Sequence, residues 1–341
     1  MRGILFLVAA LALSGCMVGP DYQRPDTGMP AAFSETTVAN GAVSVPAQWW
    51  TLYADETLNG LVQAGLQNNT DVRVAIARVE EAEAALREAR ATLFFPLVDA
   101  NAGATRSRSI SQGQRVLGNN FTLGASTSFE VDLWGRLRRA ERATRDQLAA
   151  SRYGRDTVAI TLAATIARAY FAVRSLDSQI EASRSIEAAT SESLALAQRR
   201  ADGGVASELD VYQAGGAQTA ASAQTKEFTR QRAAFVHQLG VLTGRLDLGL
   251  APASLDKLPI PPLPPEGLPL TLLERRPDLR QAEAELDAAT QLVGFARGSQ
   301  FPTLTLTGSG GVQSAALSSL FSSGSNVWSI EIGRASCRER V

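Results

Sequence analysis

The chain has 341 residues, of which 45% are hydrophobic and only 6% aromatic, and its formal net charge is −1. A charge near zero gives no electrostatic reason to bind nucleic acid, which attracts strongly basic proteins. A single histidine, His237, excludes most metal sites and nucleophilic triads, and no phosphate-binding loop is present. The composition therefore predicts neither an enzyme nor a cofactor-binding protein.

The first residues have the features of an export signal. After Met1-Arg2, the apolar run from Ile4 to Leu13 is too short to span a bilayer, so residues 1–15 are predicted to be a cleaved signal peptide. The sequence Leu-Ser-Gly before Cys16 resembles the lipobox of bacterial lipoproteins, in which the cysteine after the cleavage point is acylated. Because no Asp follows Cys16, sorting to the outer membrane is expected. An ordinary signal peptide with a chance cysteine is the alternative.

Residues 16–56 are rich in Pro, Gly and Thr and are predicted to form an extended tether that leaves the lipidated cysteine. A helix is predicted over 57–93, because apolar residues recur at steps of three and four and Pro96 ends the pattern. These positions are Val72, Ile76, Val79, Ala82, Leu86, Ala89 and Leu93.

A β-hairpin is predicted over 97–131. Apolar residues alternate with Asp, Asn, Gly, Ser and Thr on both sides of a polar loop near 112–120. Strands with one apolar and one polar face are typical of membrane barrels, although each strand alone is a weak signal. A hairpin on the sheet of a soluble protein remains the alternative at this point.

Two further helices are predicted over 133–200 and 207–242, joined by a tight turn. Gly203 and Gly204 suit a helix end, and Ser207 with Asp210 resembles a capping box. The first of these helices would span roughly 100 Å, and the helices over 57–93 and 207–242 roughly 55 Å each. Two shorter helices stacked end to end would match the long one, which fits the wall of a hollow cylinder.

The helix-to-strand order then starts again. A Pro-rich linker over 250–269 leads to a segment over 270–330 that repeats the first part of the chain. From Asp to Pro the spacing is 25 residues between Asp71 and Pro96 and 24 between Asp278 and Pro302. The sequence therefore predicts a duplicated unit of helix and sheet.

The last residues, 332–341, look like the in-frame translation of a sequencing adapter and interrupt an alternating segment. We expect the natural part of this sequence to end near Ile330 or Glu331. The alternative is that residues 332–341 are a genuine basic tail. On the first interpretation the fourth strand, which begins near Val327, is cut. The chain would then supply three strands and half of the helical wall, with its second repeat incomplete.

Five short motifs, in this order, resemble the outer-membrane channels of tripartite efflux pumps, the TolC/OprM-type family and especially its lipoprotein (NodT-type) branch. The motifs are Gly19-Pro20-Asp21-Tyr22, Trp49-Trp50, Phe129-Glu130-Val131-Asp132-Leu133-Trp134-Gly135-Arg136, Gly204-Val205-Ala206-Ser207-Glu208-Leu209-Asp210-Val211 and Leu272-Leu273-Glu274-Arg275-Arg276-Pro277-Asp278.

The resemblance implies a fold class that is mainly α with membrane β. Long periplasmic helical hairpins would form an α-barrel, and the strands would join a trimeric outer-membrane β-barrel. It implies a homotrimer in outer-membrane lipid that acts as a passive export duct for small toxic compounds. The partners would be a periplasmic adaptor and an inner-membrane transporter of the RND (resistance-nodulation-division) class.

Within that resemblance, the turn at the periplasmic tip is the candidate adaptor contact. Its residues are Gly203, Gly204, Val205, Ala206, Ser207 and Glu208. A turn that merely reverses the chain is the alternative. No catalytic or metal residue is assigned, and no cofactor is expected beyond the covalent lipid on Cys16.

Two other expectations concern single residues. The arginines after Trp134 are predicted to lie on a solvated helix face or in salt bridges between subunits, with lipid phosphates or the lumen as the alternative. They are Arg136, Arg138, Arg139, Arg142 and Arg145. Trp134 itself could join an aromatic girdle at the membrane boundary.

The competing hypotheses for the whole chain are a lipid-anchored periplasmic scaffold without a pore and a nonfunctional fragment.

Overall fold

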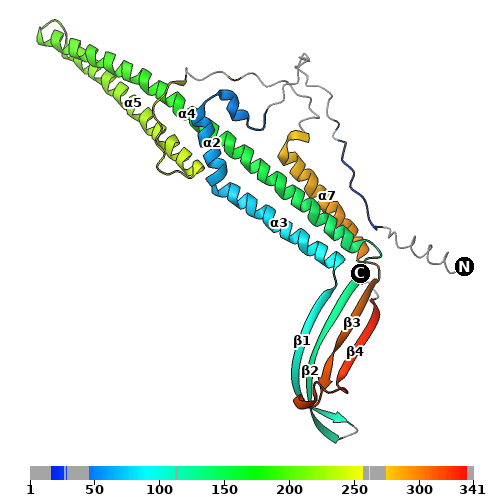
Figure 1. Cartoon of the computed structure of the whole chain (residues 1–341). Coiled ribbons are helices and arrows are strands. Elements are labelled where there is room, and N and C mark those ends of the chain that lie inside the picture. The colour runs from blue at the N-terminus through cyan, green and yellow to red at the C-terminus, as the bar shows by residue number, and fades with distance from the viewer. Residues whose placement is uncertain are drawn as a thin grey trace. The chain divides into compact units, whose positions relative to one another are not determined.

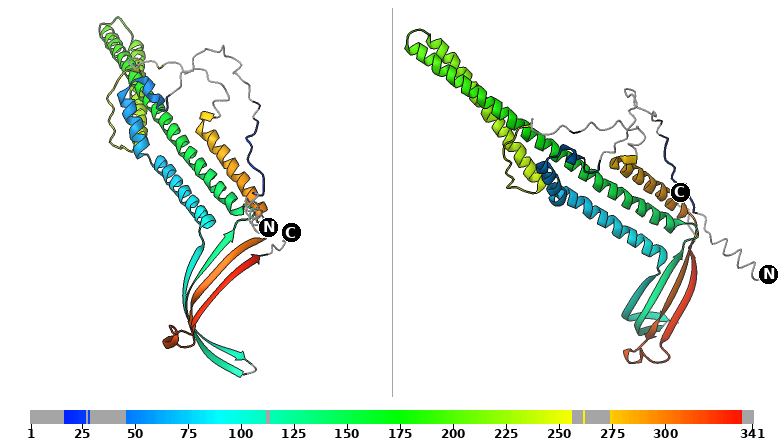
Figure 2. Two further views of the ribbon diagram at one scale, coloured as in Figure 1. Left: turned by 45° about the vertical axis from the view of Figure 1, so that its right-hand side comes forward. Right: turned by 45° about the horizontal axis from the view of Figure 1, so that its top comes forward.

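The computed structural model describes residues 17–26, 28, 46–111, 114–255, 261 and 274–335. The predicted signal peptide, Cys16, and most of the predicted linker lie outside these residues. So do residues 336–341. Figures 1 and 2 show the chain, which divides into two compact units. Unit 1 comprises residues 1–28, 78–153 and 278–341, and unit 2 comprises 29–77 and 154–277.

Helices dominate the described residues. They are η1 (Trp49–Tyr53), α2 (Glu56–Asn68), α3 (Thr70–Phe94), α4 (Arg136–Asp202), α5 (Glu208–Thr243), α7 (Pro277–Gly298) and the short turn η3 (Leu317–Ser319). The strands are β1 (Leu97–Ser111), β2 (Gln114–Val131), β3 (Thr303–Ser314) and β4 (Asn326–Ala335). At 67 residues, α4 has a length of about 100 Å.

The four strands form one antiparallel sheet in the order β1-β2-β3-β4, which Figure 1 shows as a long curved ribbon. The pairing runs without a break from Leu97 opposite Ser128 to Ser111 opposite Gln114, and it is equally regular in the other two pairs. Because no bulge interrupts the register, each residue keeps the face that its parity assigns.

The prediction of three strands is wrong. β4 is ten residues long and pairs with β3 from Asn326 opposite Val312 to Ala335 opposite Thr303. The pairing with β3 continues in the same register after Glu331, so the backbone of residues 332–335 continues the pleat. The sheet therefore has four strands, with β1 and β4 at its edges.

The prediction of one helix over 57–93 is also wrong, because Asn69 separates α2 from α3 with an extended backbone (φ −64°, ψ 135°). Its Oδ1 accepts a hydrogen bond from the Asp71 amide at 2.8 Å, which starts α3. Its Nδ2 donates to the Leu242 carbonyl at 3.1 Å, near the end of α5. The buried Asn69 therefore joins a helix boundary to a neighbouring helix.

The core of unit 2 lies where η1, α2, α4 and α5 meet. Trp50, Leu58, Ile166 and Leu239 are buried together there, and Leu58, Ile166 and Leu239 have no exposed surface. Part of α4 is apolar enough by composition to cross a membrane. Its residues Leu162, Ile166 and Val173 pack in this core instead.

Candidate functional site

The sheet of unit 1 has one mainly apolar and one mainly polar face. The apolar face carries, by parity, Val98, Ala100, Ala102, Ala104, Phe121, Leu123, Ala125, Phe129, Val131, Leu304, Leu306, Val312, Trp328, Ile330 and Ile332. The opposite face carries Asp99, Asn101, Thr105, Thr122, Ser126, Ser128, Glu130, Thr303, Thr305, Thr307, Ser309, Gln313, Ser329 and Glu331. The sheet thus has the dyad pattern of a membrane barrel.

The apolar face is open to its surroundings. Trp328, Ile330 and Ile332 are 78%, 73% and 71% exposed, and no described helix covers them. On β2 the apolar positions run from Val131 to Phe121, about 34 Å along the strand at ~3.4 Å per residue. With the usual tilt of barrel strands, this band is about 25 Å tall, which matches the lipid-facing band of outer-membrane barrels.

The junction between strands and helices ties the two repeats together. Trp134 stacks on Phe301 with ring centroids 4.8 Å apart, and its Nε1 donates to the Pro302 carbonyl at 2.9 Å. Arg136 pairs with Glu130 at 2.7 Å, and Arg138 pairs with Asp132 at 3.3 Å. Because its indole stacks on Phe301 and donates a hydrogen bond to Pro302, Trp134 joins the second repeat to the start of α4.

The prediction that Arg139 lies on a solvated helix face is wrong, because only 1% of its side chain is exposed. Its guanidinium pairs with Asp21 at 2.9 Å and donates to the Val18 and Gly19 carbonyls at 3.3 and 3.2 Å. It also donates to Gln291 Oε1 on α7 at 2.7 Å. One buried cation therefore joins the N-terminal segment to α4 and α7.

Two glycines, Gly19 and Gly294, allow the backbone of the N-terminal segment to approach α7 closely. Gly19 has a φ of +107°, and a Cβ there would lie 2.5 Å from the Gly294 Cα. A Cβ on Gly294 would lie 2.8 Å from Arg139 Nε and 3.1 Å from the Val18 carbonyl. Met17, the residue after Cys16, packs against Gly135. We call residues 17–24 the docked segment and its contacts on α4 and α7 the glycine seat.

The far end of the docked segment is held by Glu283 on α7. Arg24 pairs with Glu283 through Nε at 2.5 Å and NH2 at 2.8 Å, and the Tyr22 hydroxyl donates to the same carboxylate at 3.2 Å. The Arg24 hydrogen bond holds the pKa of Glu283 below its usual value. Burial, followed by the charge of Glu283, raises the pKa of Tyr22.

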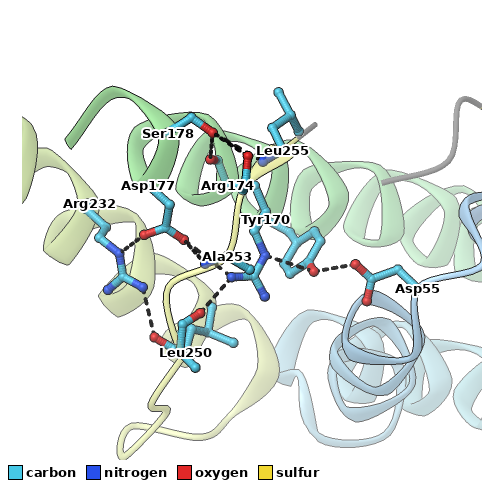
Figure 3. A network of polar contacts seen from close by, with 11 residues as sticks. Asp55, Tyr170, Arg174, Asp177, Ser178, Arg232, Leu250, Ala253 and Leu255 are labelled. Atoms are coloured by element: carbon cyan, nitrogen blue, oxygen red, sulfur yellow. Dashed lines mark hydrogen bonds and ion pairs between the residues drawn. The ribbon is translucent and has the colours of Figure 1, made fainter. Parts of the chain in front are cut away.

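In unit 2, a polar network fixes the start of the Pro-rich linker, as Figure 3 shows. Asp177, 4% exposed, accepts from Arg232 Nε at 2.5 Å and from Arg174 NH1 at 3.3 Å. Arg174 also donates to the Ala251 carbonyl at 2.7 Å, and Arg232 donates to the Leu250 carbonyl at 2.8 Å. The network therefore seats the linker on both α4 and α5.

The same network reaches α2. Arg174 Nε donates to the Tyr170 hydroxyl at 3.0 Å, and that hydroxyl in turn donates to Asp55. Asp55 is also the N-cap of α2, where it accepts from the amides of Thr57 and Leu58 at 2.8 and 3.1 Å. Burial, and then the bond to Asp55, raise the pKa of Tyr170.

The predicted tip lies in the turn between α4 and α5. Val205 N donates to Arg200 O and Gly204 N to Ala201 O, both at 2.9 Å, which is a Schellman motif with Gly204 at a φ of +71°. Ser207 then caps α5 through a reciprocal pair of hydrogen bonds with Asp210. The hydrogen bonds that the Asp210 carboxylate accepts from the Ser207 backbone amide and hydroxyl lower the pKa of Asp210.

Apolar side chains are exposed at this tip. Val205 is 78% exposed, and Leu209 and Tyr212 on the first turns of α5 are 62% and 73% exposed. A groove of about 700 Å³ begins beside Tyr212 and is lined by Leu194 on α4 and by Gly215 on α5. The predicted contact set ends at Glu208 and therefore leaves out Leu209 and Tyr212, which follow it on the first turns of α5.

Among the described residues, no group of His, Cys, Asp and Glu side chains has the arrangement of a metal site. Cys16, the predicted lipidation site, lies outside the residues that the structure describes.

Comparison with known proteins identifies the family. The family described as outer membrane efflux protein matches residues 61–245 and 268–334. The chain is 34% identical to the toluene efflux pump outer membrane protein TtgI of Pseudomonas putida, covering 95% of this chain and 71% of that protein. It is 30% identical to the cation efflux system protein CusC of Escherichia coli, with the same coverage.

The fold agrees with solved structures. The outer-membrane channel OprN superposes with a TM-score of 0.85 at 30% identity, covering 94% of this chain and 73% of that one. The predicted fold class, with helical hairpins and barrel strands, is confirmed by this likeness and by the family match. The chain belongs to the outer membrane efflux protein family and is an outer-membrane channel component of an efflux system.

Proposed function

We propose that this chain is one subunit of a homotrimeric, passive export duct. The observation that carries the proposal is the four-stranded sheet, which has an open apolar face, a polar face and two unpaired edges. An unpaired edge in lipid leaves backbone groups unsatisfied at a cost of several kcal/mol each, so sheets of several subunits must join. Three copies supply twelve strands, an even number as in bacterial barrels.

In this proposal the polar face lines water and the apolar face meets lipid. The duct carries small toxic compounds from the periplasm outward without a catalytic step in this subunit. The named relatives serve toluene and cation efflux, so the chemistry of the cargo differs within the family. Energy comes from an inner-membrane RND transporter, which a periplasmic adaptor connects to the duct.

Acylation of Cys16 fits the same proposal. The docked segment starts at Met17 beside Gly135, at the turn between β2 and α4. A lipid on the preceding residue would therefore enter the bilayer close to the level at which the strands end. This adds a second attachment to the outer membrane beside the sheet.

A periplasmic scaffold without a pore is the weaker hypothesis. A soluble sheet buries its apolar face, whereas Trp328, Ile330 and Ile332 are at least 71% exposed here. Purification in detergent distinguishes the two functions. The duct predicts a heat-resistant trimer that conducts ions in planar bilayers, and the scaffold predicts a soluble monomer once the lipid is removed.

The tip is proposed as the adaptor contact. We predict that Val205→Ser weakens export severalfold, because it removes a 78% exposed apolar side chain without disturbing a core. The measurement is the minimum inhibitory concentration of an exported compound, together with single-channel conductance, which should not change. Val241→Ser, at a side chain that is 66% exposed near the end of α5, is the matched control. Equal export by Val205→Ser and the unmodified channel would remove Val205 from the contact.

A further inference from the structure

The hairpin of β1 and β2 extends beyond the rest of the sheet and carries a cluster of positive charge. Pairing between β2 and β3 stops at Phe121 opposite Ser314, while β1 and β2 remain paired as far as Ser111 and Gln114. Figure 2 shows this two-stranded extension projecting past the turn between β3 and β4. Residues 105–120 contain three arginines and no acidic residue.

The three arginines share the apolar face of the sheet. In the register, Arg106 lies opposite Asn119, Arg108 opposite Leu117 and Arg115 opposite Ile110. These pairs are the next three rows after Ala104 and Phe121, the last row of the apolar band. We call Arg106, Arg108 and Arg115 the arginine cluster.

The distance of the cluster from the apolar band fits the headgroup region of a membrane. Each row advances about 6.8 Å along the strand, or about 5 Å along the membrane normal at the usual tilt. The three rows therefore lie about 5, 10 and 15 Å beyond the hydrocarbon band. The helices begin at the opposite end of the strands, so in the proposed orientation the cluster is at the outer leaflet.

The charges of the cluster have no partner within the described part of the chain. All three side chains are exposed, and none of them makes an ion pair or a hydrogen bond with a residue whose side chain the structure describes. At the other end of the strands, in contrast, Arg136 and Arg138 pair with carboxylates at 2.7 and 3.3 Å. Leu117 and Ile110, 52% and 74% exposed, lie opposite Arg108 and Arg115 on the same face.

We propose that the arginine cluster binds the phosphate groups of the phosphorylated glycolipid in the outer leaflet of the outer membrane, and this rests on the proposed function. Guanidinium groups form forked, charge-assisted hydrogen bonds with phosphate oxygens. The arginine cluster lies on the apolar face, opposite to the polar face that lines water in the proposed duct. Exported cargo in the duct therefore does not reach it.

The test is a triple variant, Arg106→Gln, Arg108→Gln and Arg115→Gln, with a matched control. The control is Arg73→Gln, Arg78→Gln and Arg87→Gln, which removes three exposed charges from α3. Each full channel is purified and placed in phosphatidylcholine nanodiscs that contain lipid A, phosphatidylglycerol at equal phosphate, or neither. Native mass spectrometry then counts the lipid A molecules that each trimer retains.

The unmodified channel and the control should retain lipid A. An arginine near an anionic surface contributes about fivefold in affinity, so the cluster variant should bind roughly 100-fold more weakly. Unchanged retention by the cluster variant overturns the inference. An equal loss of phosphatidylglycerol and lipid A overturns the assignment to the glycolipid. Recovery of heat-resistant trimers from outer membranes is scored first, and its failure for the unmodified channel overturns the proposed function as well.

Discussion

At the scale of single residues, the docked segment depends on the lack of a Cβ atom at Gly19 and Gly294. Gly19 and Gly294 let two backbones approach so closely that a single added Cβ would meet a Cα at 2.5 Å. Their closeness brings the Val18 and Gly19 carbonyls within reach of the buried Arg139. The segment is therefore held by shape as well as by charge.

We predict that Gly19→Ala releases the docked segment from α7. The substitution adds a clash with backbone atoms and strains a φ of +107°, which together cost about 1–3 kcal/mol. Hydrogen exchange of residues 18–26 should accelerate by about fivefold or more. Gly28→Ala is the control, because Gly28 also has a positive φ but no atom lies within 4 Å of its added Cβ. Equal exchange in both variants would argue against the glycine seat.

Asp146 makes the stability of unit 1 depend on pH. Burial, and then the charge of Asp287 on α7, raise the pKa of Asp146 from 3.8 to about 6. A raised pKa in the folded state favours the protonated form, so its stabilising effect is complete below pH 3.8 and is lost as the pH rises through about 6. At neutral pH the ionised carboxylate is therefore destabilising.

Asp146→Asn should consequently raise the melting temperature at pH 7.5. The gain should shrink at pH 5, where the unmodified side chain is mostly protonated. Thermal unfolding of both proteins at the two pH values is the measurement. A variant that is less stable at both values would show that the Asp146 carboxylate makes a favourable contact instead.

At the scale of elements, the network around Asp177 determines where the linker leaves the helices. Two arginines from different helices share this one carboxylate, and each also holds a linker carbonyl. Ala253 N donates to the same Asp177 at 3.2 Å. Removing Asp177 would leave two cations close together with no counter-charge.

Asp177→Ala is expected to lower the free energy of unfolding by about 3–5 kcal/mol and to increase hydrogen exchange at residues 251–255. The control is Asp156→Ala, which removes a carboxylate that is 45% exposed and pairs with its neighbour Arg155. That change should stay within about 0.5 kcal/mol. Chemical denaturation measures both. Similar losses in the two variants would contradict a special role for the network.

Helix boundaries were predictable where the sequence contains local signals. Gly204 and Ser207 mark the turn between α4 and α5 within two residues of the expected bounds. The break at Asn69 was missed although a local signal marks it, because Asn69 caps α3 through the Asp71 amide and Asp71 lies in the first turn of that helix. Its second bond, to the Leu242 carbonyl, joins a distant part of the chain and was not predictable. Arg139 was misplaced for the same reason, because its partners come from distant segments.

At the scale of the whole molecule, alternation in the strands carries most of the functional argument. The faces of 97–105 and 121–131 were predictable because a period of two needs no tertiary information. The length of β4 was not predictable, since the composition of residues 332–335 suggested an artefact while pairing with β3 extends the strand through them. Adaptor contact and lipidation of Cys16 stay predictions.

The central claim is that one face of the sheet meets lipid and the other meets water. The most direct measurement labels single cysteines with a membrane-impermeant maleimide in outer-membrane vesicles. The background carries Cys337→Ser, because Cys337 is the only cysteine of the chain besides the proposed lipidation site Cys16. Asn101→Cys and Thr105→Cys should react, whereas Ala100→Cys and Ala104→Cys should be protected, because they lie on opposite faces of β1. Equal reaction at all four positions would mean that water reaches both faces, and it would contradict the account of this chain as a channel wall.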